Sequence, residues 1–168
     1  MGSILRAAGC YQAQSIRYTG ERYARAKAFS TDTKNAHLKI AVTQVDAVID
    51  PINDKHLTKV AVELVEGAIP LPLFEHPQAA LYIFGPEDGS IEQDVVDQCD
   101  HVVYIPTIGC MNLAATVNVL LYDRLAKTTQ MPVDDEIIKN SHEIQKTTIL
   151  VKWPQSAENL SNRKPVLN

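Results

Sequence analysis

Short apolar segments alternate with amphipathic segments along the first 127 residues of the chain. Residues 38–45, 80–84 and 101–105 are runs of β-branched and other apolar side chains, and each is expected to form a buried strand. A shorter strand is expected at 14–18, and residues 69–74 form an apolar run that two prolines interrupt.

In five further segments, apolar residues recur at the spacing of one helix face. These segments are residues 3–11, 21–29, 54–65, 91–99 and 111–127. Ser90 is placed to cap the fourth of them. Buried strands that alternate with helices predict an α/β fold, in which a parallel sheet carries helices on both faces. Residues 130–168 are mostly polar, and we expect a peripheral extension there.

Length and composition favour one soluble domain. The chain has 168 residues, of which 45% are hydrophobic and 21% charged. It has no apolar run of the roughly 20 residues that a membrane span requires and no signal-peptide pattern at its start, so no membrane partner is expected. Cys10, Cys99 and Cys110 form neither a CxxC pair nor a Cys/His cluster, so we expect neither a disulfide scaffold nor a metal site. A cytoplasmic protein is predicted.

Charge is distributed unevenly along the chain. Residues 1–39 hold seven basic and two acidic side chains, a net charge of +5, whereas the remaining residues carry −9 of the total −4. A basic segment on an acidic body suits a polyanionic partner that approaches from one side, although a solvated basic helix gives the same pattern. The candidate RNA-binding residues are Arg6, Arg17, Arg22, Arg25 and Lys27.

Two loops after expected strands carry unusual residues. In open parallel sheets, ligands bind beyond the carboxyl ends of the strands, and residues 84–90 and 105–113 lie at two such ends. Either could also be an ordinary turn between strand and helix. The sequence contains no GxGxxG, GxxxxGK[ST] or GxSxG pattern, so the usual dinucleotide, P-loop and serine-hydrolase sites are unsupported.

The two loops together carry a family resemblance. Residues 84–90 read FGPEDGS, residues 104–125 read YIPTIGCMNLAATVNVLLYDRL, and residues 1–9 read MGSILRAAG. They resemble the second, third and first motifs of the SpoU (TrmH-like) branch of the SPOUT RNA methyltransferases: FGPE-x-x-G, IPM followed by S-[ML]-N-[LV], and N-x-G-x-[IL]-[IL]-R. All three occur in the family order and cover nearly the whole of residues 1–127.

Some positions depart from the family pattern. Thr107 stands where methionine is usual, and Cys110 stands where serine is usual. The asparagine of the first motif would precede Met1, so the first motif is truncated, and we expect the fold to lack the strand that normally comes before it.

The resemblance implies an enzyme that transfers a methyl group from S-adenosylmethionine (AdoMet) to a ribose 2′-hydroxyl of tRNA or rRNA. It implies a methyltransferase domain over residues 1–129 that ends in a trefoil knot, and a homodimer formed through the last helix of the knot. The implied cofactor contacts are Val42, Gly85, Ile105, Cys110, Met111, Asn112 and Leu113. Glu87 would brace the loops that hold the cofactor, and Asn112 would also tie the start of the last helix to its neighbour.

Arg6 is the candidate catalytic residue. A 2′-hydroxyl is a poor nucleophile until the charge left by its departing proton is stabilised. Because arginine stays protonated in proteins, Arg6 is better suited to act as a fixed cation beside the developing alkoxide than as a base.

Two other functions remain open. One is a catalytically weak or inactive knotted dimer that acts as an RNA-binding module. The other is a doubly wound nucleotide-binding domain of unrelated function, which would require the motif agreement to be chance.

Overall fold

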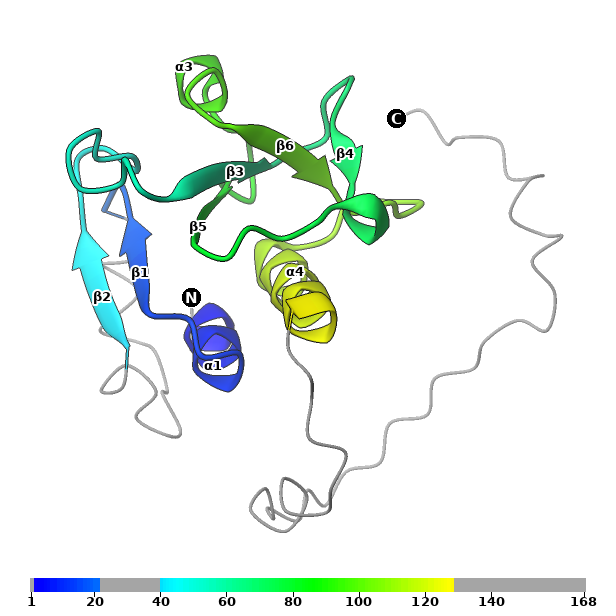
Figure 1. The fold of residues 1–168 in the computed structure, drawn as a ribbon, viewed down its shortest axis with the longest axis horizontal. Helices are drawn as coiled ribbons and strands as arrows, with labels where there is room; N and C mark the ends of the chain where they lie inside the picture. Colours follow the sequence, from blue (N-terminus) through cyan, green and yellow to red (C-terminus); the bar gives the residue numbers. More distant parts are fainter. Residues whose placement is uncertain (1, 22–39, 129–168) are drawn as a thin grey trace, which may run out of the picture. The chain divides into compact units, whose positions relative to one another are not determined.

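The computed structural model describes residues 2–21 and 40–128 (Figure 1). The chain divides into two compact units, Met1–Met131 and Pro132–Asn168, and all described residues belong to the first. Most of the helix predicted at 21–29 and all of the polar extension predicted at 130–168 lie outside the described residues.

The core of the first unit is a four-stranded parallel sheet in the order β4-β6-β3-β5. Its strands are β3 (Thr58–Val62), β4 (Ile69–Pro70), β5 (Ala80–Phe84) and β6 (His101–Tyr104). Strand β3 lies in the middle and pairs in parallel with both β5 and β6. Val60 and Ala61 are fully buried, as expected of a central parallel strand that is covered on both faces. The strands predicted at 80–84 and 101–105 are confirmed.

The helix predicted over residues 54–65 is wrong, because this segment contains β3. Its apolar residues recur at intervals of three and four, a spacing that fits a helix face. The same residues form a short, nearly continuous apolar run, which is also the pattern of a strand buried on both faces. Three of the five residues of β3 are β-branched, and their position between β5 and β6 decides the outcome.

A second, smaller sheet pairs β1 (Ser15–Tyr18) in parallel with β2 (Ala41–Gln44). The strands predicted at 14–18 and 38–45 are therefore confirmed, with the second shortened. The parallel arrangement was also predicted, but the described strands are divided between two sheets.

Helices α3 (Gln93–Val96) and α4 (Leu113–Thr128) lie on opposite sides of the four-stranded sheet (Figure 1). Leu120 of α4 is fully buried against the sheet, in one cluster with Val60 and Val103. Helix α1 (Gly2–Cys10) packs against α4 and buries Leu5, Ala7 and Ala8.

Three segments differ in detail from the elements expected there. The prolines of the apolar run at 69–74 end β4 after two residues, and the 3₁₀ helix η2 (Leu71–Leu73) follows. Helix α3 spans only four residues, and Glu92 rather than Ser90 occupies its N-cap position. The last helix begins at Leu113, where the Asn112 side chain accepts a hydrogen bond from the Ala115 amide at 2.9 Å.

A buried carboxylate joins β1 to the loop that precedes β3. The Arg17 guanidinium donates to Oδ2 of Asp54 at 2.6 Å, and the Asp54 side chain is fully buried. The same oxygen accepts a hydrogen bond from the Asp50 amide, whereas Asp54 Oδ1 is buried without a partner among the described residues. The hydrogen bond from Arg17 is the main reason that the pKa of Asp54 lies below its usual value. The positive charge of Arg17 thus compensates a charge inside the protein.

A polar network fastens α4 to the segment between η2 and β5. His76 Nε2 lies 2.9 Å from Asp123 Oδ2, and His76 Nδ1 lies 2.6 Å from the Tyr82 hydroxyl. Arg124 donates to that hydroxyl at 2.9 Å, and Lys127 contacts Asp123 at 2.7 Å. This pattern assigns a neutral His76 that donates from Nε2 to Asp123 and accepts at Nδ1 from Tyr82. Burial lowers the pKa of His76.

The His76 network predicts a loss of stability in mild acid. Since the pKa of His76 is lower in the folded protein than the value of about 6.5 in an unfolded chain, the unfolded state binds more protons in the interval between the two values. The contribution of the neutral His76 to the free energy of unfolding is complete above about pH 6.5 and is lost as the pH falls toward the pKa of the folded protein. Over this interval the free energy of unfolding changes by at most about 1.4 kcal/mol per pH unit.

Denaturant unfolding between pH 7.5 and 5 measures this slope. In His76→Gln, the amide can replace both hydrogen bonds but does not titrate, so the slope should decrease. The matched control is His56→Gln, at an exposed histidine. An equal slope in the wild type and His76→Gln would contradict the assignment.

Candidate functional site

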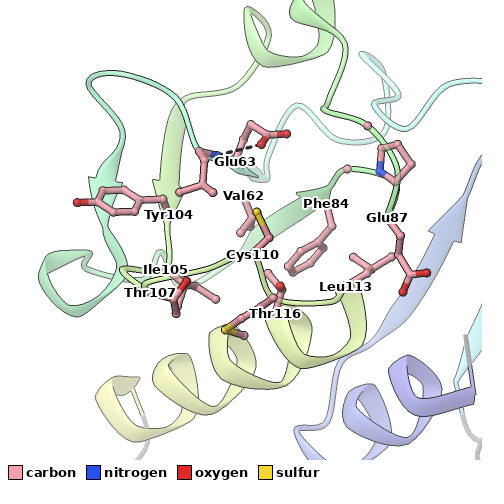
Figure 2. A pocket seen from close by; sticks show the side chains of 15 residues that line it. Val62, Glu63, Phe84, Glu87, Tyr104, Ile105, Thr107, Cys110, Leu113 and Thr116 are labelled. Atoms are coloured by element: carbon pink, nitrogen blue, oxygen red, sulfur yellow. Dashed lines mark hydrogen bonds between the residues drawn. The ribbon is translucent and has the colours of Figure 1, made fainter. Parts of the chain in front are cut away.

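A cavity of about 200 Å³ lies at the carboxyl ends of β3, β5 and β6. Figure 2 shows side chains from these strand ends, from the loops that follow them and from α4 arranged around it. Six of the residues singled out from the sequence line this cavity. They are Gly85, Glu87, Ile105, Cys110, Met111 and Leu113. The fold thus brings the second and third motifs together at the edge of the sheet where ligands of parallel sheets bind.

Two of the proposed cofactor residues lie elsewhere. Val42 belongs to β2, where it pairs with Ile16, and does not line the cavity. Asn112 is not among the lining residues either, and its side chain caps α4. The capping bond fixes the start of the helix that supplies Leu113 and Thr116 to the cavity wall.

The position of Val42 follows from the error at 54–65. A cofactor contact at Val42 requires strand 38–45 to lie beside the strands that end at the site, but the strand between β5 and β6 is β3. The residues that follow β3, Glu63 and Leu64, line the cavity and were missed. The available signal was an acidic residue directly after the buried run Val60–Val62, an arrangement typical of a site at a strand end.

Glu63 connects the end of β3 to the loop after β5. Its Oε2 accepts a hydrogen bond from the Ile91 amide at 2.9 Å, and its Oε1 accepts one from the Leu64 amide at 2.9 Å. The Glu63 amide donates to the Val103 carbonyl at 3.0 Å, which continues the pairing of β3 with β6. Glu63 therefore contacts both the loop that follows β5 and strand β6, at the cavity wall.

Gly85 is required because the surrounding backbone is close. A Cβ atom at this position would lie 3.2 Å from the Ile91 amide nitrogen and 3.4 Å from Glu63 Oε2. Residue 85 lines the cavity, and a side chain there would force the Ile91 backbone or Glu63 to shift by a few tenths of an ångström.

The charged side chains that line the cavity are all acidic. Glu63 and Glu87 contribute carboxylates, and no lysine, arginine or histidine is found among the lining residues. The remaining wall is formed by backbone and by apolar or small polar side chains, including Phe84 and Thr116 (Figure 2). Thr107 donates to the Gly109 carbonyl at 2.6 Å and closes the turn that follows β6. Such a cavity favours a ligand that carries positive charge and disfavours phosphates.

The two candidate RNA-contacting residues within the described ranges do not line the cavity. Arg6 is exposed on α1 and does not line the cavity. Arg17 pairs with the buried Asp54. The candidates Arg22, Arg25 and Lys27 lie outside the described residues.

The described residues contain neither a cluster of metal-binding side chains nor a membrane-spanning helix. No group of three or more His, Cys, Asp or Glu side chains within residues 2–21 and 40–128 is arranged to hold a metal ion. In the same ranges, no helix combines the length and the apolar character needed to cross a membrane.

Comparison with known proteins identifies the family. The model of the SpoU rRNA methylase family matches residues 1–122. The chain belongs to this family, as the three motifs predicted. No curated protein sequence matches the chain.

Solved structures share the fold. One is a TrmH/SpoU tRNA modifying enzyme of A. aeolicus, with a TM-score of 0.64 and 16% identity over 75% of this chain and 67% of that one. Another is AviRb of Streptomyces viridochromogenes in complex with AdoMet, with a TM-score of 0.63 and 20% identity over 74% and 54%. A third is an RNA 2′-O ribose methyltransferase, with a TM-score of 0.63 and 20% identity over 75% and 50%. The chain spans about half the length of most of these structures.

Proposed function

We propose that this protein is an AdoMet-dependent RNA methyltransferase that modifies a ribose 2′-hydroxyl of tRNA or rRNA. The observation that carries the proposal is the cavity at the strand ends, where residues of two SpoU motifs meet. Structures with this fold include an AdoMet complex and an RNA 2′-O ribose methyltransferase, which supports the choice of cofactor and of reaction.

The chemistry of the cavity fits AdoMet. This cofactor carries a positive sulfonium and an ammonium group, and the cavity presents two carboxylates and no cationic side chain. The backbone at Gly85 offers polar groups of the kind that bind the edge of an adenine. A nucleoside triphosphate would meet carboxylates where it needs cations, so these charges disfavour the unrelated nucleotide-binding domain. The volume of about 200 Å³ is below the range of about 300–1,000 Å³ usual for pockets that enclose a drug-sized ligand, so we expect part of AdoMet to remain outside it.

The chain's own residues have three tasks in this proposal. Gly85, Ile105, Cys110, Met111 and Leu113 hold the cofactor, which supplies an activated methyl group. Arg6 stabilises the developing alkoxide of the ribose and contacts the adjoining phosphate, which lowers the pKa of the hydroxyl. Arg22, Arg25 and Lys27 add phosphate contacts that orient the RNA.

Calorimetry and methyl incorporation test the proposal together. AdoMet is expected to bind, ATP is expected to bind far more weakly, and tritium from labelled AdoMet is expected in bulk tRNA or rRNA. Absence of AdoMet binding at millimolar concentration would exclude the proposed function.

A second function, an RNA-binding module without substantial activity, is favoured by one observation. Arg6 does not line the cavity of its own chain. RNA binding and AdoMet binding without methyl incorporation would support this second function.

The proposal includes a homodimer formed through α4 and a trefoil knot at the end of the methyltransferase domain. Val119 and Tyr122 of α4 are 39% and 55% exposed, so apolar surface remains beside the face that α1 and the sheet cover. An isologous contact would bury this surface on both subunits. Light scattering at micromolar concentration is expected to give twice the chain mass of 18.6 kDa. A mass equal to one chain would remove the dimer from the proposal.

A further inference from the structure

The loop of residues 85–91 is held at both of its ends by two consecutive residues at the carboxyl end of β3: the last residue of the strand and the residue that follows it. At its start, Phe84 of β5 pairs with Val62, the last residue of β3. At its end, the Ile91 amide donates a hydrogen bond to the carboxylate of Glu63, which directly follows Val62 in the sequence. Glu63 is itself fixed, because its amide donates to the Val103 carbonyl of β6. The end of β3 thus determines where the loop leaves the sheet and where it returns.

Two neighbouring features of the segment do not themselves join it to β3. The position of Gly89 allows close packing on Pro86, because a Cβ on Gly89 would lie 3.4 Å from Pro86 Cγ. This contact shapes the loop internally and does not join it to β3. Helix α3, which follows Ile91 after one further residue, has four residues, no side-chain hydrogen bond at its N-cap and no buried residue. A segment this short contributes little to holding the loop in place.

We propose that Glu63 is a positioning residue that fastens the loop to the end of β3 and so sets the wall of the cofactor cavity. This inference rests on the proposed function, because it concerns the site to which we assign AdoMet. Glu63, Gly85, Pro86, Glu87 and Gly89 all line the cavity, so release of the loop at Ile91 would move a whole side of it. This positioning role depends on the carboxylate as a hydrogen-bond acceptor, because its oxygens accept hydrogen bonds from the amides of Leu64 and Ile91. Its negative charge adds to the electrostatic fit to AdoMet but does not fasten the loop.

Two substitutions separate hydrogen bonding from charge. Glu63→Ala removes the acceptor for the Ile91 amide, whereas Glu63→Gln keeps one oxygen acceptor and removes the charge. We expect Glu63→Ala to weaken the binding of both AdoMet and its uncharged-sulfur product, S-adenosylhomocysteine, by about tenfold or more, since a partly buried hydrogen bond to a charged group is lost. Glu63→Gln is expected to stay within about threefold of the wild type for both ligands. The matched control is Glu66→Ala, at an exposed glutamate that does not line the cavity.

Amide hydrogen exchange of Ile91 provides a test that needs no ligand. In Glu63→Ala, the Ile91 amide is expected to exchange at least about tenfold faster, while amides of β3 and β5 keep their protection and report an intact sheet. In Glu63→Gln and Glu66→Ala, the Ile91 amide should exchange as in the wild type.

Three other outcomes contradict either the inference or the proposed function. If Glu63→Ala binds both ligands as the wild type does, the loop does not depend on Glu63. If Glu63→Gln loses AdoMet affinity as strongly as Glu63→Ala but retains S-adenosylhomocysteine, the charge is the decisive property and the positioning role is wrong. If the wild type binds neither ligand, the proposed function fails, and exchange at Ile91 still decides whether Glu63 fastens the loop.

Discussion

Replacement of Arg6 by alanine is expected to lower methyl transfer to RNA by about 10²–10³-fold, the effect of removing one preorganised group that stabilises a developing oxyanion. Arg6 is exposed on α1, outside the set of residues that line the cavity. AdoMet affinity should therefore remain nearly unchanged. The measurements are tritiated-methyl incorporation at saturating RNA and AdoMet calorimetry on the same preparation.

The control for Arg6→Ala is neutralisation of Arg22, Arg25 and Lys27. These changes should weaken RNA binding and reduce its salt dependence by about one unit per lost phosphate contact, without altering turnover at saturating RNA. Arg17 is unsuitable as a control, because its removal would leave the buried Asp54 carboxylate without its cation. Unchanged turnover in Arg6→Ala would contradict the catalytic role and favour the RNA-binding module.

The sequence predicted those parts of the fold in which local pattern and tertiary position agree. The runs at 80–84 and 101–105 are short, apolar and bounded by turn residues, and both are strands. The last helix was predicted within two residues at each end from its long apolar pattern, and Asn112, which the prediction placed inside the helix, caps its start. The prediction for residues 58–62 was wrong because the spacing of their apolar side chains fits a helix as well as a buried strand. Only the pairing of this segment with β5 and β6 distinguishes the two.

The candidate site was predicted to a similar extent and for a related reason. Loop motifs that carry glycine and proline are visible in sequence, and six of the site residues predicted from them line one cavity. Glu63 belongs to no recognised motif, and its role depends on a hydrogen bond to Ile91, 28 residues away. The pairing of Arg17 with Asp54 also spans 37 residues, so sequence alone indicated a free basic side chain where the structure has a compensated one.

Replacement of Gly85 by valine is expected to weaken cofactor binding strongly. The added Cβ would meet the Ile91 amide nitrogen at 3.2 Å and Glu63 Oε2 at 3.4 Å, and the first of these is backbone that cannot rotate away. The branched methyl groups require further space, so the loop must shift away from β3, at a cost typical of overpacking, about 1–3 kcal/mol. We therefore expect AdoMet affinity to fall by about 5- to 150-fold, with a smaller loss in Gly85→Ala.

Gly109→Val is the matched control for Gly85→Val, because it places the same side chain in the other motif loop. A Cβ at Gly109 would have no atom within 4 Å, and the residue does not line the cavity, so AdoMet binding should persist. Calorimetry on both variants, with circular dichroism to verify folding, makes the comparison. If Gly85→Val folds and binds AdoMet as the wild type does, the loop of residues 85–91 is not the cofactor wall. If AdoMet binding is weakened in Gly85→Val but not in Gly109→Val, then binding depends on the close packing of residue 85 against Ile91 and Glu63 at the end of β3.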